Sequence, residues 1–264
     1  MDLDLHQKHI LITGGSKGIG LACAKAFLAE GAVVTLISRT QANLDSARAA
    51  LIQDGFDATL VHLCAADLTQ AADAEQALEQ ACIAAGEIDV LVNSAGAASR
   101  IPAFELTPDD WQDAMNSKFF SYINILNPAL KRMAQRGSGS VVNIVGIGGK
   151  VASAVHVAGG AANAALLLAS AGLAAAYGPK GVRVNAVNPG RTLTDRMQGL
   201  LEAEAAQHRI SLEEATHRAG AKMPFGRVAQ ASEIANAVVF LASSKASYIS
   251  GSILTVDGAL TATI

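Results

Sequence analysis

The sequence predicts an α/β fold, a doubly wound parallel sheet of about seven strands with helices on both faces. Two observations predict it. Short apolar runs rich in β-branched residues alternate along the chain with longer segments of helical periodicity. The runs are apolar at nearly every position, which is typical of strands buried on both faces of a parallel sheet. Because no Pro- or Ser-rich linker interrupts this order, residues 1–264 are expected to form a single domain.

Seven runs are expected to form strands, and in chain order they contain HILIT, VVTLIS, TLVHLC, DVLVN, SVVNIV, VRVNAV and SILTV. They are expected at 8–13, 33–38, 58–65, 88–95, 140–145, 182–189 and 252–258. The segments between them carry apolar residues at helical spacing, and the first ends at a glycine, Gly31. Helices are expected at 18–30, 40–54, 70–85, 107–135, 157–177 and 231–242.

Residues 191–228 break the alternation with a polar, helical pattern. They follow the carboxyl end of a predicted strand. Because ligands of open α/β sheets bind beyond the carboxyl ends of the strands, an insert at this place lies over the ligand crevice. We therefore expect residues 191–228 to act as a substrate lid.

Composition narrows the classes of partner. The chain is 51% hydrophobic and 16% charged with a net charge of −3, which argues against disorder, and it has no basic run of the kind that binds nucleic acid. The N-terminus has no signal-peptide pattern, and no apolar run is expected to reach the ~18 residues of a membrane span. Three cysteines without metal-ligand spacing indicate free thiols in the cytoplasm and no metal site. The expected ligand is a small molecule.

A glycine-rich turn joins the first strand to the first helix and reads TGGSKGIG over residues 13–20. Glycines let backbone N–H groups approach a pyrophosphate, and the helix N-terminus attracts its negative charge. This position, directly after a strand and at the start of a helix, predicts a Rossmann-type dinucleotide site. The expected contacts are Gly14, Ser16, Lys17, Gly18 and Ile19.

The second strand ends at Ser38 and Arg39. NAD-binding folds carry a carboxylate near this position for the ribose 2′-hydroxyl, and a carboxylate would repel a 2′-phosphate. Arg39 can instead form charge-assisted hydrogen bonds to phosphate, and Lys17 adds a second cation from the facing loop. Two cations without an acid favour NADP(H) as the cofactor.

These motifs and several later ones together resemble the short-chain dehydrogenase/reductase family over nearly the whole chain. The similar segments are TGGSKGIG, AADL, NSAG, AMNSK, NPG and the C-terminal GRVAQASEIANAVVFLAS and SYISGSILTVDG. The resemblance implies further cofactor contacts at Asp67, Leu68, Asn93, Ala95, Gly96, Asn163, Pro189, Gly190, Thr192 and Thr194. It also implies a helix asparagine in the active site, for which we take Asn116.

The resemblance fails at the catalytic residues. Members of this family use Ser, Tyr and Lys, in which the tyrosine exchanges a proton with the substrate oxygen. The serine position here is Gly146, and the family spacing then places the tyrosine at Gly159 and the lysine at Asn163. The family spacing between its lysine and the asparagine of the RVNAV segment, counted back from Asn185, places the lysine at Asn163 as well. Of the four catalytic positions, only Asn116 is retained.

No tyrosine of the chain is a natural replacement, because Tyr122, Tyr177 and Tyr248 lie far from this register, and we interpret them as structural. His156 and Lys150 lie between the fifth strand and its helix. An imidazole titrates near neutral pH and can pass a proton, and a lysine can polarise a carbonyl.

Arg100 and Arg191 also border the expected crevice, and either can hold an anionic substrate. The alternative to a functional role for His156, Lys150, Arg100 and Arg191 is that each is an ordinary solvated or packed side chain.

Three functions are compatible with these residues. The first is an NADP(H)-dependent oxidoreductase that reduces or oxidises a carbonyl, hydroxyl or quinone-like small molecule through a non-standard proton donor. The alternative is a catalytically inactive NADP(H)-binding protein that acts as a sensor or partner subunit, and a non-redox reaction in the same pocket is a third. The resemblance further implies a homotetramer that pairs helices 107–135 and 157–177 between subunits.

Overall fold

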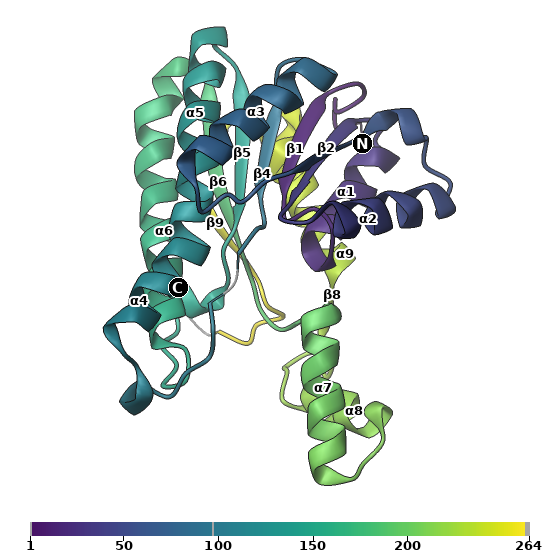
Figure 1. Ribbon diagram of the computed structural model, residues 1–264, viewed down its shortest axis with the longest axis vertical. Coiled ribbons are helices and arrows are strands. Elements are labelled where there is room, and N and C mark those ends of the chain that lie inside the picture. The colour runs from purple at the N-terminus through teal and green to yellow at the C-terminus, as the bar shows by residue number, and fades with distance from the viewer. Residues whose placement is uncertain (1, 97, 262–264) are drawn as a thin grey trace.

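A computed structural model describes residues 2–96 and 98–261. Its core is one sheet of seven parallel strands in the order β3-β2-β1-β4-β5-β6-β9 (Figure 1). The strands are β1 (His9–Thr13), β2 (Val33–Ser38), β3 (Val61–Ala65), β4 (Val90–Asn93), β5 (Gly139–Ile144), β6 (Val182–Pro189) and β9 (Ile253–Val256). The order reverses direction between β1 and β4, which is the topological switch point where such sheets bind ligands. The predicted fold class is confirmed.

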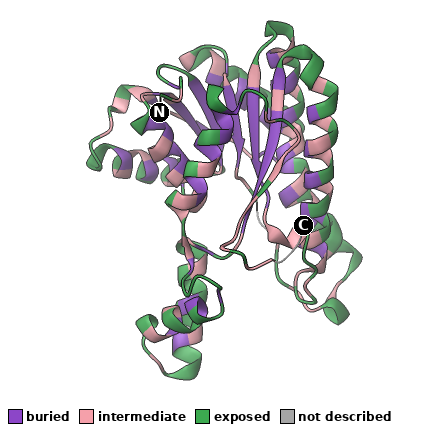
Figure 2. Cartoon of the chain, turned by 180° about the vertical axis from the view of Figure 1, so that it is seen from behind, coloured by how far each residue is buried: buried purple, intermediate pink, exposed green. Residues whose placement is uncertain are grey.

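Helices cover both faces of the sheet because alternate strand residues point to opposite sides. Ile10 and Ile12 join one apolar core with helices α1 (Gly18–Ala29), α2 (Gln41–Gln53) and α9 (Ala231–Ala242). Leu11 joins the opposite core with α3 (Ala71–Ala85), α5 (Ser121–Arg136) and α6 (Val157–Tyr177). Figure 2 shows the buried strands enclosed between these two helical layers.

The predicted helix at 107–135 is divided into three parts. A capping box of Thr107 and Asp110 begins α4 (Pro108–Ala114). A π-helix, Met115–Phe120, follows and leads directly into α5. Such π-helical turns are rare and are frequent at functional sites. The strand predicted at 58–65 is also shorter, because residues 58–60 form a 3₁₀ turn.

A chain of polar side chains crosses the carboxyl ends of the central strands. Thr13 Oγ1 donates a hydrogen bond to Asn93 Oδ1 at 3.3 Å, and Asn93 Nδ2 donates to Asn143 Oδ1 at 2.9 Å. Asn143 Nδ2 in turn donates to Ser170 Oγ at 2.9 Å. The network joins β1, β4, β5 and α6, and it fixes the edge of the sheet from which the ligand crevice opens.

Residues 191–228 project from this edge as an arm (Figure 1). The arm contains α7 (Asp195–His208) and α8 (Leu212–Ala221). Its base is closed by two short parallel strands, β7 (Thr192–Leu193) and β8 (Ala229–Gln230). Leu201, Ala205, Ala215, Ala219 and Val228 form a separate apolar cluster inside it.

One segment contradicts the expectation that no apolar run has the length of a membrane span. Residues Val157–Lys180, which comprise α6 and the following turn, are long and apolar enough by composition. However, 44% of the most apolar window is buried inside the fold, and core helices of globular proteins meet the same criterion. The apolar character of α6 is explained by its packing on the sheet.

Candidate active site

The glycine-rich turn between β1 and α1 leaves no room for side chains. A Cβ on Gly14 would lie 2.8 Å from the Ser94 carbonyl oxygen, and one on Gly18 would lie 3.3 Å from Thr194 Cγ2. At these two glycines the backbone therefore packs closely against the segment after β4 and the base of the arm. This is the shape that a pyrophosphate needs at a helix N-terminus, so the residues present fit a dinucleotide.

The predicted 2′-phosphate residues lie together at the ends of two elements. Ser16 Oγ donates a hydrogen bond to Ser38 Oγ at 3.2 Å, which ties the turn to the end of β2. Lys17 and Arg39 are both exposed, and neither forms an ion pair with a carboxylate in the described part of the chain. Two unpaired cations beside this turn suit a phosphate.

Asp67 and the residues after β4 border the same crevice. Asp67 follows β3, and its Oδ1 accepts hydrogen bonds from the backbone N–H and the hydroxyl of Thr69, while the neighbouring Leu68 is buried. The backbone N–H of Ala95 donates to Thr13 Oγ1 at 3.2 Å. Gly96 adopts a φ of +84°, and a Cβ there would overlap the Ser117 carbonyl oxygen.

The loop after β6 forms the opposite wall. Pro189 is buried, and Gly190 approaches Asp257 so closely that a Cβ would lie 2.7 Å from the Asp257 Cβ. Thr192 is buried and donates its hydroxyl hydrogen to the Gly190 carbonyl. Thr194 Oγ1 accepts the Met197 N–H and caps α7. The structure thus brings the sequence-predicted cofactor residues of five loops to one edge of the sheet.

The positions where the resemblance fails lie side by side. Gly146 has a φ of +127°, a backbone conformation that favours glycine, and its N–H donates to Asn188 Oδ1 at 2.9 Å. A Cβ on Gly146 would stand 3.6 Å from Nδ2 of Asn163. Within the described chain, three buried polar atoms here lack a hydrogen-bond partner: Asn163 Oδ1, Asn188 Nδ2 and His156 Nδ1. Unpartnered buried polar groups of this kind indicate a missing ligand or water.

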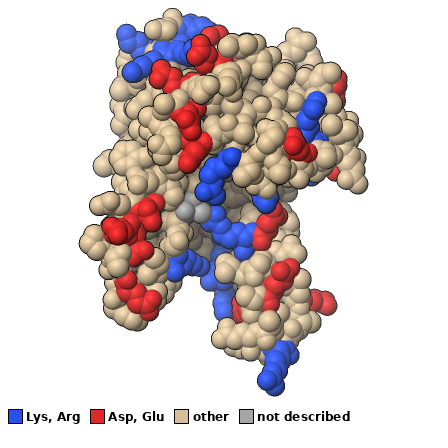
Figure 3. All heavy atoms as spheres, viewed as in Figure 1, with Lys and Arg blue, Asp and Glu red and all other residues tan. Residues whose placement is uncertain are grey.

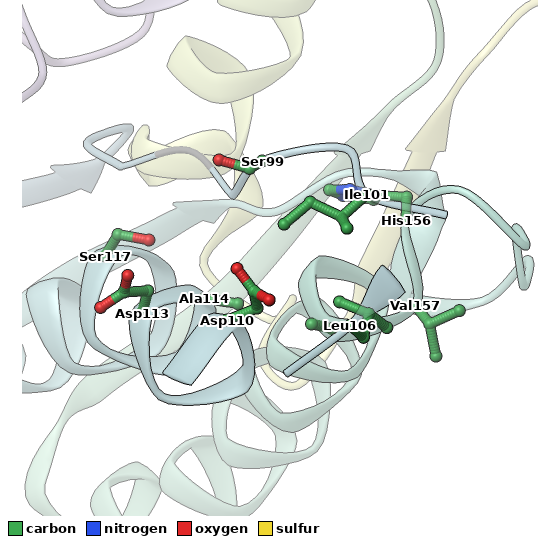
Figure 4. A pocket seen from close by; sticks show the side chains of 10 residues that line it. Ser99, Ile101, Leu106, Asp110, Asp113, Ala114, Ser117, His156 and Val157 are labelled. Atoms are coloured by element: carbon green, nitrogen blue, oxygen red, sulfur yellow. The ribbon is translucent and has the colours of Figure 1, made fainter. Parts of the chain in front are cut away.

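The imidazole of His156 fills the space at position 159. A Cβ on Gly159 would lie 2.6 Å from His156 Nε2 and 2.8 Å from the Ala98 Cβ. The ring also borders a pocket of about 390 Å³ of open space between the 99–106 segment, α4 and the start of α6. Figure 4 shows His156 beside Ile101, with Asp110 and Asp113 on the facing helix.

The electrostatic surroundings of His156 are mostly cationic. Burial lowers the pKa of His156, the backbone carbonyl of Ser99 raises it, and the positive charges of Arg100, Arg196 and Lys118 lower it further. Figure 3 shows Lys and Arg side chains gathered in the hollow between the sheet edge and the arm. The neutral imidazole is therefore favoured, and it is able to accept a proton.

The other sequence candidates lie at the periphery. Lys150 is exposed at the end of a short 3₁₀ turn, and Arg100 is exposed in the loop after β4. Arg191 is exposed and lines a second pocket of about 500 Å³ under the arm. Of the tyrosines, Tyr122 is buried and Tyr248 is fully exposed.

The π-helix places a different residue inward from the one predicted. The side chain of Asn116 is exposed, whereas that of Lys118, two residues later, is buried. Lys118 precedes the buried positions Tyr122, Ile125 and Leu126 at helical spacing. That spacing is the sequence signal by which Lys118 was recognisable, because it lies on the same apolar stripe.

The chain is similar to a known family of enzymes along nearly its whole length. The family model described as enoyl-(acyl carrier protein) reductase matches residues 14–261. D-threitol dehydrogenase of Mycolicibacterium smegmatis is 34% identical over 260 residues, which cover 98% of this chain and 95% of that protein. The chain belongs to the short-chain dehydrogenase/reductase family. The resemblance inferred from the motifs is confirmed at this level.

Two solved structures of the family are informative about the cofactor. L-sorbose reductase from Gluconobacter frateurii, complexed with NADPH and L-sorbose, has a TM-score of 0.93 and 28% identity, with 100% of both chains covered. An NADPH-bound short-chain oxidoreductase from Pseudomonas aeruginosa PAO1, described as containing an atypical catalytic center, has a TM-score of 0.90 and 29% identity over 99% of both chains. These structures agree with the prediction of NADP(H). In the described residues, no group of three His, Cys, Asp or Glu side chains is placed to hold a metal.

Proposed function

We propose that this protein is an NADP(H)-dependent oxidoreductase that acts on a carbonyl, hydroxyl or quinone-like small molecule through a non-standard proton donor. The observation that carries the proposal is the phosphate turn with Lys17 and Arg39 beside it and no acid at the end of β2. The similarity to small-molecule dehydrogenases and to NADPH-bound reductases supports the same cofactor and reaction class.

We assign the remaining cofactor residues the following roles. The backbone of residues 14–20 would bind the pyrophosphate, and Asp67 and Leu68 would border the adenine. Asn93, Ala95, Gly96 and the 189–194 loop would enclose the nicotinamide end. There, Asn163 Oδ1, which has no hydrogen-bond partner among the described residues, would accept a hydrogen bond from a ribose hydroxyl. When bound, the nicotinamide supplies or accepts a hydride.

The proton must then come from a group other than tyrosine. His156 occupies the space at Gly159, borders a pocket and has an unpartnered nitrogen. We assign it the direct proton exchange with the substrate oxygen. Lys150 and Asn116 are both exposed, so they are secondary candidates for a role in the reaction. Lys150→Ala and Asn116→Ala test them in the same turnover assay as His156→Gln.

The arm and the assembly complete the proposal. We assign residues 191–228, which project from the sheet edge as an arm, the role of a substrate lid. The exposed Leu168 and the small residues of α6 suit close helix contact in a homotetramer, and no role with nucleic acid or membrane is proposed for this cytoplasmic enzyme.

Calorimetric titration with NADPH and with NADH tests the cofactor. NADPH is expected to bind at least about tenfold more tightly, a difference of about 1.4 kcal/mol. The double substitution Lys17→Ala with Arg39→Ala removes most of this difference. The control pair Lys131→Ala with Arg209→Ala removes similar exposed charges elsewhere and leaves it unchanged. Equal binding of both dinucleotides by the wild type contradicts the assignment.

Turnover separates an enzyme from an inactive binding protein. The second candidate is favoured by one observation, the replacement of the family's catalytic positions by Gly146, Gly159 and Asn163. A screen of quinones and activated carbonyls with NADPH decides between the two candidates, since such reactive substrates can be reduced without a catalytic tyrosine. Oxidation of NADPH that falls in His156→Gln supports the proposal, whereas tight binding without turnover of any substrate favours the sensor.

A further inference from the structure

Lys118 is a buried cation that the proposed function does not yet use. Its side chain is 8% exposed, and Nζ donates hydrogen bonds to Tyr122 Oη at 2.8 Å and to the Ile144 carbonyl at 3.2 Å. Nζ also lies 4.5 Å from the centre of the Tyr122 ring. Tyr122 gives its own hydroxyl hydrogen to the Ile144 carbonyl at 2.6 Å. Among the described residues, no carboxylate pairs with Lys118.

An ammonium in this environment is energetically unfavourable. Burying a charge without a charged partner costs several kcal/mol, which a methionine of similar length would avoid. Burial, and to a smaller extent the charge of Arg196, lower the pKa of Lys118 to about 7. Ionisable groups in such surroundings concentrate at functional sites, and so do π-helices such as the one that carries Lys118.

The amine lies beside the positions where the family resemblance fails. Ile144, whose carbonyl accepts its hydrogen bond, is two residues before Gly146. The π-helix packs against α6, which carries Asn163, and the charge of Lys118 contributes to the lowered pKa of His156. The family lysine position is Asn163, so the amine absent from α6 is present on the neighbouring helix.

We propose that Lys118 exchanges protons with the reaction and acts through His156 rather than on the substrate itself. The inference rests on the proposed function. In carbonyl reduction, the imidazolium gives its proton to the alkoxide oxygen left by hydride addition. A proton then passes from the ammonium of Lys118, through an intervening water molecule, to the neutral imidazole, whose Nδ1 has no hydrogen-bond partner among the described residues. The resulting amine takes a proton from water, so one hydride and one proton are consumed per carbonyl. Alcohol oxidation runs the same steps in reverse.

The charged groups around the pair set the expected pH range. Lys118 faces Tyr122 on its own helix and the positive charge of Arg196 from the arm. His156 is influenced by Arg100 as well. On the neighbouring α4, Asp110 and Asp113 line the adjacent pocket. Because the cations act on both groups in the same direction, each group is expected to lose its proton at a lower pH than it would in water.

NMR titration of the cofactor-free protein tests the first part. With ¹³C-labelled lysine side chains, one lysine signal is expected to titrate near pH 7, and it is absent from Lys118→Met and from Lys118→Arg. The matched control Lys131→Met, an exposed lysine of the same helical run, retains that signal. In Lys118→Met the pKa of His156 is expected to rise, because a nearby positive charge has been removed. A Lys118 signal that titrates near pH 10, or an unchanged His156, overturns the inference.

Kinetics with the carbonyl identified by the screen test the second part. The ionisation near neutral pH in kcat/KM is expected to vanish in Lys118→Arg, which retains the charge but does not release a proton. The value at the optimum falls about tenfold or more. If the ionisation in the pH profile of kcat/KM persists in Lys118→Arg and disappears in His156→Gln, the proton comes from His156 alone. That result contradicts the relay. Absence of dinucleotide binding contradicts the proposed function instead, whatever the titration of Lys118.

Discussion

The imidazole of His156 lies where a side chain on Gly159 would begin, and a Cβ at that position would stand 2.6 Å from Nε2. The ring and a side chain on Gly159 therefore exclude each other. A tyrosine introduced at this position has no space while His156 retains its conformation. The site is built around a histidine, and restoring the family residue alone is not expected to restore the family chemistry.

The substitution Gly159→Ala tests this packing. The added methyl group forces the His156 ring to move, and overpacking of this kind typically costs about 1–3 kcal/mol. We expect a net loss of about 1 kcal/mol in the free energy of unfolding, measured by urea denaturation. In a His156→Ala background the loss is expected to be smaller, because only the close contact with the Ala98 Cβ, at 2.8 Å, then remains. Gly172→Ala is the control, because nothing lies within 4 Å of a Cβ there, and alanine gains about 1 kcal/mol over glycine in a helix.

Cofactor preference is expected to reverse when an acid is placed at the end of β2. Ser38→Asp supplies a carboxylate for a ribose 2′-hydroxyl and repels a 2′-phosphate. The dissociation constant for NADPH should rise about tenfold or more, and that for NADH should fall, by calorimetry. Ser38→Asn has nearly the same shape without the charge. If both variants lose NADPH affinity equally, the repulsion argument is wrong.

Loss of the Ser170 hydroxyl is expected to destabilise the core. In Ser170→Ala the buried Nδ2 of Asn143 loses its acceptor, and an unsatisfied buried group costs about 1–3 kcal/mol. Chemical denaturation measures the loss. Ser46→Ala removes an exposed hydroxyl that bonds to the Ala42 carbonyl, and it should change stability by less than about 0.5 kcal/mol. Similar effects of the two substitutions would show that the polar chain contributes little.

His9 is expected to make folding stability depend on pH. Its ring contacts the Gly86 carbonyl at 2.7 Å and Thr35 Oγ1 at 2.8 Å. Burial lowers the pKa of His9 below its ordinary value of 6.5, so the unfolded chain binds a proton more readily than the folded one. The stabilising contribution of the neutral ring is complete above pH 6.5 and is lost as the pH falls through the folded pKa.

The substitution His9→Gln removes this titration. Its stability should fall less than that of the wild type between pH 7.5 and about 5, as thermal unfolding across this range would reveal. His217→Gln, which changes an exposed histidine of α8, should retain the wild-type slope. Parallel curves for all three proteins would show that His9 is not the titrating group.

The fold and the cofactor side followed from the sequence because their signals are local. Buried parallel strands read as apolar runs, and the phosphate turn needs glycines that are adjacent in the chain. The π-helix itself carries no such signal, since one extra residue per turn leaves the composition of 107–135 unchanged. The signal for Lys118 is its helical spacing to the buried Tyr122 and Ile125, whereas Asn116 was chosen from the family motif. The position of the His156 ring against Gly159 depends on the loop between β5 and α6, whose conformation is set by contacts distant in sequence.

The arm joins the rest of the fold through the two-residue strands β7 and β8 and encloses its own apolar cluster. A substitution that repacks α7 against α8 therefore leaves both cores of the sheet intact. Over evolutionary time, this segment can diverge, lengthen or be exchanged at little risk to foldability. Among descendants of such a chain, the arm is where sequences should drift fastest while the seven strands beneath it stay recognisable.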